Sequence, residues 1–133
     1  MDLGITSESW GVDDTSWLAS RKGLDTCRSV TLDVSTFTQA THYPDGFLPS
    51  GLPLAHDTAK GMYVPYDSAG VGDTGILAGF LRGVVHIGDP APARAGAALQ
   101  WEGVVDSRFL PLPVDAAGRT DVAAHFRCEN VGA

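Results

Sequence analysis

The sequence predicts a small, mainly β domain, and three features support this. Its apolar runs are about 4 to 8 residues long and end at Gly, Pro, Asp or Ser, which is the pattern of short strands joined by turns. Glycine makes up 16 of the 133 residues, about twice its usual share, as a chain with many tight turns requires. The length suits one domain with a core of its own.

Residues 1–28 are expected to form an N-terminal arm, followed by one β domain over residues 29–133. Large hydrophobic side chains in the arm are widely spaced among Ser, Thr, Gly and Asp, with no alternating strand beside them. We expect them to anchor the arm on a partner, because Trp is enriched among interface anchors. The anchoring residues are Leu3, Ile5, Trp10, Trp17 and Leu18. The alternative, that the two tryptophans fold back onto their own domain, stays open.

Within the arm, the sequence allows a short helix through Trp17 and Leu18. Asp13 or Asp14 can cap its N-terminus, and Gly23 can end it in a left-handed conformation. Such a helix is too short to be stable without contacts to the rest of the protein.

The first strand of the domain is predicted over residues 29–37. Hydrophobic residues alternate with polar ones in this segment, so the hydrophobic side chains share one face. The many β-branched residues also favour a strand. We expect Val30, Leu32 and Val34 to face the core.

Two Pro/Gly turns are predicted next, of which the Pro-Asp-Gly turn at residues 44–46 is the stronger. Proline presets the first dihedral angle of the turn, and glycine accepts a positive φ. Short strand pieces are then expected at Leu52, Leu54 and residues 62–64.

Residues 75–87 are almost entirely apolar, with Gly79 and Gly83 four positions apart. A buried helix would contain both glycines, each costing roughly 1 kcal/mol relative to alanine. We therefore favour a central strand with bends or bulges. Its expected core residues are Phe80, Leu81 and Val84.

The last third of the chain is predicted to contain three more strands. They cover residues 98–105, a Pro-interrupted edge at 108–114, and residues 125–129. Between the second and third, Asp115 can cap a short helix, in which Gly118 lowers the helical propensity.

The charge of the chain excludes some classes of partner. Sixteen acidic and nine basic side chains give a net charge of −7, which repels phosphate backbones, so we expect no nucleic-acid partner. No apolar run approaches the roughly 20 residues that span a bilayer, and the first residues lack the pattern of a secretion signal. We therefore expect no membrane partner, and synthesis in the cytoplasm.

Candidate chemistry is sparse in this sequence. Residues 70–75 match the G-x-G-x-x-G pattern of dinucleotide-binding turns, but their turn-rich surroundings favour a loop. Cys27 and Cys128 are too few for a zinc site and are expected to be thiols, with a disulfide as the alternative. The histidines are scattered without metal-ligand spacing. We therefore expect no metal, no cofactor and no catalytic residue.

Three segments, LPSGLPLA at residues 48–55, KGMYVPYD at 60–67 and GILAGFL at 75–81, follow one another in the middle of the chain. Together with residues 16–38 and 114–127, they resemble the head-decoration proteins of tailed bacteriophages. The likeness is greatest to the actinobacteriophage branch of the family typified by the lambda decoration protein, and it covers nearly the whole chain. The long arm with its two tryptophans departs from the family pattern.

The resemblance implies a β-tulip-like domain that forms a homotrimer and cements the outer surface of an icosahedral head. Its implied partner is the major capsid protein at three-fold and quasi-three-fold junctions, bound after the head has expanded. The implied role is to stabilise the virion against the pressure of packaged DNA, so an enzyme is not expected. The acidic balance agrees with an outer position, because the DNA lies inside the shell.

Two alternatives remain open at this point. One is another structural β-domain of the virion, such as a head fibre base or a tail-associated domain. The other is a small β-fold hydrolase in which His56 or His86 acts with a carboxylate. The adjacent pair His56 and Asp57 is a poor acid/base pair, because neighbouring residues on a strand face opposite ways.

Overall fold

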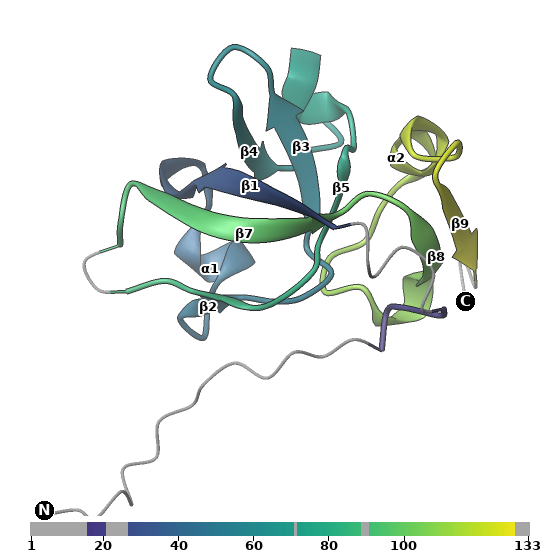
Figure 1. The fold of residues 1–133 in the computed structure, drawn as a ribbon, viewed down its shortest axis with the longest axis horizontal. Coiled ribbons are helices and arrows are strands. Elements are labelled where there is room, and N and C mark those ends of the chain that lie inside the picture. Colours follow the sequence, from purple (N-terminus) through teal and green to yellow (C-terminus); the bar gives the residue numbers. More distant parts are fainter. Residues whose placement is uncertain (1–15, 21–26, 71, 89–90, 130–133) are drawn as a thin grey trace, which may run out of the picture.

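The computed structural model describes residues 16–20, 27–70, 72–88 and 91–129. These residues form a mainly β fold centred on a closed barrel (Figure 1). The prediction of a small β barrel or sandwich with at most two short helices is confirmed for the described residues. Around the barrel, the strands follow the order β1 (Arg28–Asp33), β4 (Met62–Pro65), β3 (Pro53–Asp57), β5 (Gly79–Leu81) and β7 (Arg94–Gln100).

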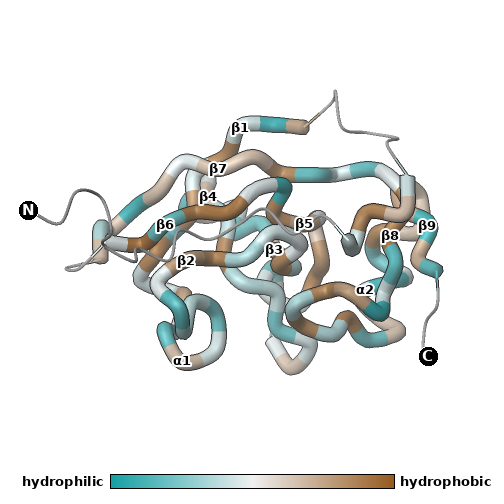
Figure 2. The backbone as a smooth tube through the Cα atoms, turned by 90° about the horizontal axis from the view of Figure 1, so that it is seen from below, coloured by the Kyte–Doolittle hydropathy of each residue, from teal (hydrophilic) through white to brown (hydrophobic). Residues whose placement is uncertain are grey.

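Two small sheets extend the barrel. Strand β2 (Phe47–Leu48) pairs antiparallel with β6 (Val85–His86), and Figure 2 shows these largely hydrophobic strands side by side. Strand β8 (Gly103–Asp106) pairs in parallel with β9 (Phe126–Glu129). The described helices are α1 (Gln39–His42) and α2 (Ala116–Asp121), with 3-10 turns η2 (Val34–Thr36), η3 (Gly72–Gly75) and η4 (Ser107–Phe109).

Strand β1 closes the barrel, but it is shorter than predicted. It pairs antiparallel with β7 along its whole length and meets β4 in parallel at Leu32. It ends at Asp33 because the hydroxyl of Ser35 donates to the Asp33 carboxylate (2.6 Å) and that of Thr36 to the Asp33 carbonyl (2.6 Å). Such local hydrogen bonds compete with strand pairing.

The predicted inward face of this first strand is therefore only partly confirmed. Leu32 is fully buried, as expected, and Val30 is half-buried and packs against the same cluster. Val34 is also buried, but it belongs to the 3-10 turn η2 and not to a strand.

The apolar run at residues 75–87 is broken into separate pieces, as the bends at its glycines suggested. Phe80 and Leu81 in β5 are fully buried, which confirms them as core residues. Val84 is half-buried and lies outside β5, so its prediction as a core residue of this strand is wrong. The reason is that the chain leaves the barrel after Leu81 and pairs with β2 through β6.

The last third of the chain is partly as predicted. Helix α2 begins at its expected cap, where a carboxylate oxygen of Asp115 accepts the backbone N–H of Gly118 (2.9 Å), and β9 follows it. The predicted strand at 98–105 is interrupted between β7 and β8. The predicted edge strand at 108–114 is wrong: the segment begins in η4 and continues without strand pairing. Its two prolines lack the N–H that a ladder needs.

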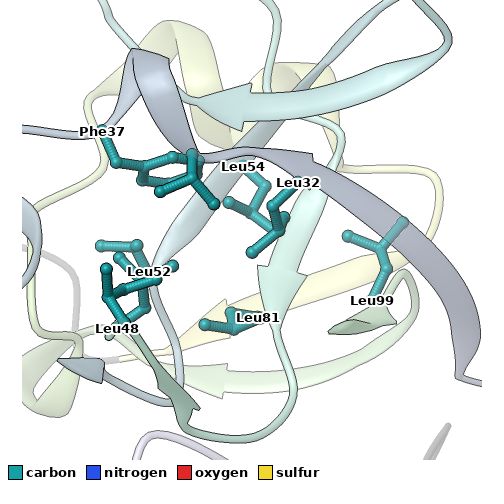
Figure 3. Packing of buried hydrophobic residues seen from close by; sticks show 9 residues of the cluster. Leu32, Phe37, Leu48, Leu52, Leu54, Leu81 and Leu99 are labelled. Carbon is teal, nitrogen blue, oxygen red and sulfur yellow. The ribbon is translucent and has the colours of Figure 1, made fainter. Parts of the chain in front are cut away.

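The core consists of two clusters on opposite faces of β5. Leu81 points into the barrel interior, whereas its neighbour Phe80 points the other way, as alternation along a strand requires. The second cluster lies between the barrel and the β8–β9 unit with α2, and contains Trp17, Leu77, Phe80, Val105, Val122 and Phe126. The barrel cluster, shown in Figure 3, includes Leu32, Phe37, Leu48, Leu52, Leu54, Leu81 and Leu99.

No helix in the described ranges combines the length and the apolar composition needed to cross a membrane.

Candidate functional site

Trp17 fixes the N-terminal segment on the domain. Its side chain is fully buried, with its ring centroid 5.6 Å from that of Phe80. The indole Nε1 donates to the hydroxyl of Ser50 (2.9 Å), which in turn donates to the carbonyl of Arg82 (2.8 Å). Gly51, with φ of +90°, lies so close that a Cβ there would sit 2.8 Å from the indole ring. The Pro/Gly turn at residues 49–51 is therefore shaped to hold this ring.

The backbone around Trp17 is also docked, on strand β8. The N–H of Asp106 donates to the Trp17 carbonyl (2.7 Å), and the N–H of Ala19 donates to the Val104 carbonyl (3.0 Å). Leu18 forms an antiparallel bridge with Val105 and packs on the second core cluster. The described residues here form no helix, so the predicted helix through Trp17 and Leu18 is wrong.

These contacts correct the prediction that Trp17 and Leu18 anchor an arm on a partner. Trp17 is an internal core residue, and for this residue the alternative of folding back onto its own domain is confirmed. Nothing in the local sequence reveals the pairing, because its partners lie more than thirty positions away. Leu3, Ile5 and Trp10, the other predicted anchors, lie outside the described residues.

Residues 109–114, with the sequence FLPLPV, form a strap between η4 and α2. Leu110 and Val114 pack against the second core cluster, and Leu112 packs against the barrel cluster. The alternate residues Phe109, Pro111 and Pro113 are exposed. The strap therefore ties the two cores together with one row of side chains and presents a second apolar row to the outside.

An apolar groove of about 250 Å³ lies beside the strap. Pro111 and Leu112 of the strap form one wall, and the segment from α1 to the start of β3 forms the other. The lining residues from this second wall are Thr41, His42, Pro44, Asp45, Phe47, Pro49 and Leu52. The groove thus brings together two parts of the chain that are far apart in the sequence.

The groove is almost uncharged. Residues 46–55 and the strap contain no Asp, Glu, Lys or Arg, which leaves Asp45 as the carboxylate of the lining. Burial lowers the pKa of His42, so the neutral imidazole is favoured, and its Nδ1 accepts the Thr38 N–H (2.8 Å). Such a surface suits an apolar partner better than a charged one.

Phe109 precedes the groove-lining residue Pro111 by two positions in the strap. Among the described residues, the exposed large hydrophobic side chains are Phe109, 49% exposed, and Ile76, 54% exposed. The guanidinium of Arg108 lies 5.0 Å from the Phe109 ring centroid and pairs with the Asp106 carboxylate (2.8 Å). The charge nearest to Phe109 is therefore already neutralised within the chain.

The histidines weighed as catalytic groups make ring contacts. His56 stacks on Tyr63 with the ring centroids 4.5 Å apart, and His86 lies 6.1 Å from Phe47. Asp57, next to His56, instead accepts the backbone N–H of Ala59 (3.1 Å) in the β3–β4 turn. The hydrolase alternative thus gains no support from these contacts.

The other sequence candidates are also placed within the described ranges. Both cysteines are free thiols, and the Cys27 thiol donates to the side chain of Gln100 (3.1 Å). Burial raises the pKa of the Cys128 thiol. The glycine-rich segment at 70–75 contains the 3-10 turn η3, and no cluster of metal-ligating side chains occurs among the described residues.

Comparisons of the chain with protein-family models, with curated proteins and with solved structures find no match. The candidate site is therefore defined by its own chemistry. It is an apolar surface formed by the strap, the groove and Phe109, and it lies on the same domain as the docked N-terminal segment.

Proposed function

We propose that this protein is a capsid decoration protein of a tailed bacteriophage. It forms a homotrimer that binds the outer surface of the expanded icosahedral head at three-fold and quasi-three-fold sites. Its partner is the major capsid protein, and its role is to stabilise the virion against the pressure of the packaged DNA. In this proposal, the barrel is a β-tulip-like domain and the N-terminal residues form its arm.

The observation that carries the proposal is the placement of the three segments on which the resemblance rests. Residues 48–55 contain most of β3, residues 60–67 contain β4, and residues 75–81 contain β5. Strand β3 pairs with both β4 and β5. The segments therefore form one continuous part of the barrel wall, so the resemblance concerns a structural unit and not three unrelated stretches.

The docking of Trp17 supports a revised boundary for the arm. Because Trp17 is fixed in the core, the part of the arm that can reach the shell is residues 1–15. Fifteen extended residues reach at most about 50 Å at roughly 3.4 Å per residue. Leu3 and Ile5 suit addition of a strand to a neighbouring sheet, and Trp10 suits an apolar pocket.

Trimer formation would increase the binding strength that weak contacts of the single arms provide. Ordering an arm on binding costs free energy, so one arm binds modestly. Three arms on one trimer raise the effective concentration and can increase avidity by roughly a hundred-fold or more. The net charge of −7 keeps the exposed trimer soluble and away from nucleic acid.

The proposal is tested by deleting residues 1–15, which leaves Trp17 in place. We expect the truncated protein to keep its fold and its trimeric state but to be lost from expanded heads on sedimentation. A full-length variant with Leu3, Ile5 and Trp10 all changed to Ser should lose binding in the same way. Unchanged occupancy of the heads by both variants would contradict the role of the arm.

A further inference from the structure

We propose that the strap and the apolar groove form the contact between copies in the homotrimer, with Phe109 of one copy in the groove of the next. The inference rests on the trimer of the proposed function and adds the surface that builds it. Three properties of the described residues support it: the size of the groove, its charge and its rigidity.

The groove has the size and lining for an aromatic side chain. Cavities of about 150 Å³ lined by apolar groups take up a benzene ring, and this groove measures about 250 Å³. Its lining includes Phe47, Leu52 and Leu112, with prolines around them. Phe109 is half exposed, so it has apolar surface left to bury. Burying it in a neighbour's groove removes both apolar surfaces from water.

The charge of the chain favours a second copy as the occupant. Two copies that each carry −7 repel one another wherever carboxylates meet. The walls of the groove come mainly from residues 46–55 and 109–114, which contain no charged side chain, and Arg108 beside Phe109 is paired with Asp106. Copies can therefore approach through this surface with little electrostatic cost, whereas a basic partner would meet a single carboxylate of the lining, that of Asp45.

The strap is held rigidly enough to serve as an interface. Leu110 and Val114 are packed on one core and Leu112 on the other, so the exposed row between them is already ordered. Ordering costs on association are correspondingly small. Phe109 and Pro111, which belongs to the groove wall, lie two positions apart in the chain. If the three-fold axis of the trimer runs close to the strap, we expect the Phe109 of each copy to lie near the groove of the next copy. Such a head-to-tail contact closes into a ring when the rotation between copies matches the three-fold symmetry of the proposed trimer.

The test uses full-length protein and measures its mass in solution by light scattering after size exclusion. Phe109→Arg should convert the trimer to a monomer with an unchanged circular dichroism spectrum, and it should lower the thermal midpoint because association no longer stabilises the folded chain. The matched control is Ile76→Arg, which charges the other exposed large hydrophobic residue and should leave the trimer intact. A Phe109→Arg protein that stays trimeric would overturn the inference.

A second variant tests the groove itself. Thr41 is exposed on α1 and lines the groove, so Thr41→Arg should block it and also give a monomer. A mixture of the two monomeric variants still offers one intact Phe109 and one open groove, and should form a 1:1 dimer that cannot close. A mixture that stays monomeric would contradict the pairing of Phe109 with the groove.

Failure of this inference is distinguishable from failure of the proposed function. If the wild-type protein is a trimer that binds expanded heads and the Phe109→Arg protein is also a trimer, only the proposed interface is contradicted. If the wild-type protein is a monomer and does not bind expanded heads, both the interface and the proposed function are contradicted.

Discussion

Trp17 joins three parts of the molecule at a single residue. Its ring packs on Phe80 of the barrel, and its indole N–H reaches Ser50 in the turn before β3. Its carbonyl accepts the N–H of Asp106 in β8. A buried indole N–H without a partner would cost free energy, so the hydroxyl of Ser50 is part of what makes this burial favourable.

We predict that Trp17→Ala lowers the free energy of unfolding by about 3–5 kcal/mol, because it removes a large buried side chain and leaves a cavity. Trp17→Phe should cost less, since it keeps much of the packing but leaves Ser50 without its donor. Urea unfolding monitored by circular dichroism measures both. Ile76→Ala, at an exposed site, is the control and should change stability by about 0.5 kcal/mol or less. Equal stability of all three variants would contradict the burial of Trp17.

Asp33 is a second residue whose contacts have a measurable consequence. The hydrogen bond from Ser35 and then that from Lys60 (3.0 Å) hold the pKa of the Asp33 carboxyl below its usual value. In the unfolded chain this pKa returns to about 3.9. The unfolded state therefore binds more protons between the two pKa values, and stability rises with pH in that interval.

We predict that the stabilisation from Asp33 is fully present above about pH 4 and is lost as the pH falls through the lower, folded pKa. Ser35→Ala removes the largest cause of the shift and should flatten the dependence of unfolding free energy on pH in this acidic range. Urea midpoints measured across it provide the test. Ser29→Ala, on the exposed part of β1, is the matched control and should keep the wild-type profile. Identical profiles for both variants would show that Ser35 does not set this pKa.

At the scale of elements, the sequence predicts those whose signals are local. Strand β1 and the cap of α2 by Asp115 depend on residues within a few positions, and both occur, although burial along β1 alternates only in part. The break after β5 depends on the pairing of β6 with β2, and the strap depends on packing against two cores. These partners are distant in the sequence. The apolar composition of residues 75–87 and 108–114 therefore predicted strands there without indicating where the strands would break or what they would pack against.

The candidate site was missed at the sequence level for the same reason. The groove joins α1 and the β2 region to Pro111 and Leu112, which periodicity cannot connect. The run FLPLPV could have suggested an exposed apolar segment, because its prolines argue against a central strand. The burial of Trp17 had no comparable signal, since its neighbours in the sequence, apart from Leu18, are small or polar.

The close approach of β5 and β7 gives a prediction for an element. A Cβ at Gly79 would lie 2.6 Å from the backbone carbonyl of Gln100 and 3.0 Å from the side chain of Leu99. Gly79→Ala should therefore destabilise the barrel by about 1–3 kcal/mol through overpacking. Gly96→Ala on β7 is the matched control: a Cβ there would meet no described atom within 4 Å, so it should be neutral or stabilising. Thermal unfolding compares the two, and equal effects would contradict the tight β5–β7 contact.

At the scale of the whole molecule, the barrel and the β8–β9 unit are held together by a shared second core, the strap and the docked segment around Trp17. This arrangement gives the protein a rigid body and a fixed starting point for residues 1–15. In the proposed function, the body provides the trimer and the arm provides the contact with the shell. Stabilisation of the head then comes from bridging several capsid subunits at once.

The most direct test is electron cryomicroscopy of heads that lack this protein, before and after adding it in purified form. The account predicts density for one trimer over each three-fold and quasi-three-fold site of expanded heads, and none on unexpanded procapsids. Density confined to a vertex, a fibre or the tail, or no bound density at all, would contradict it.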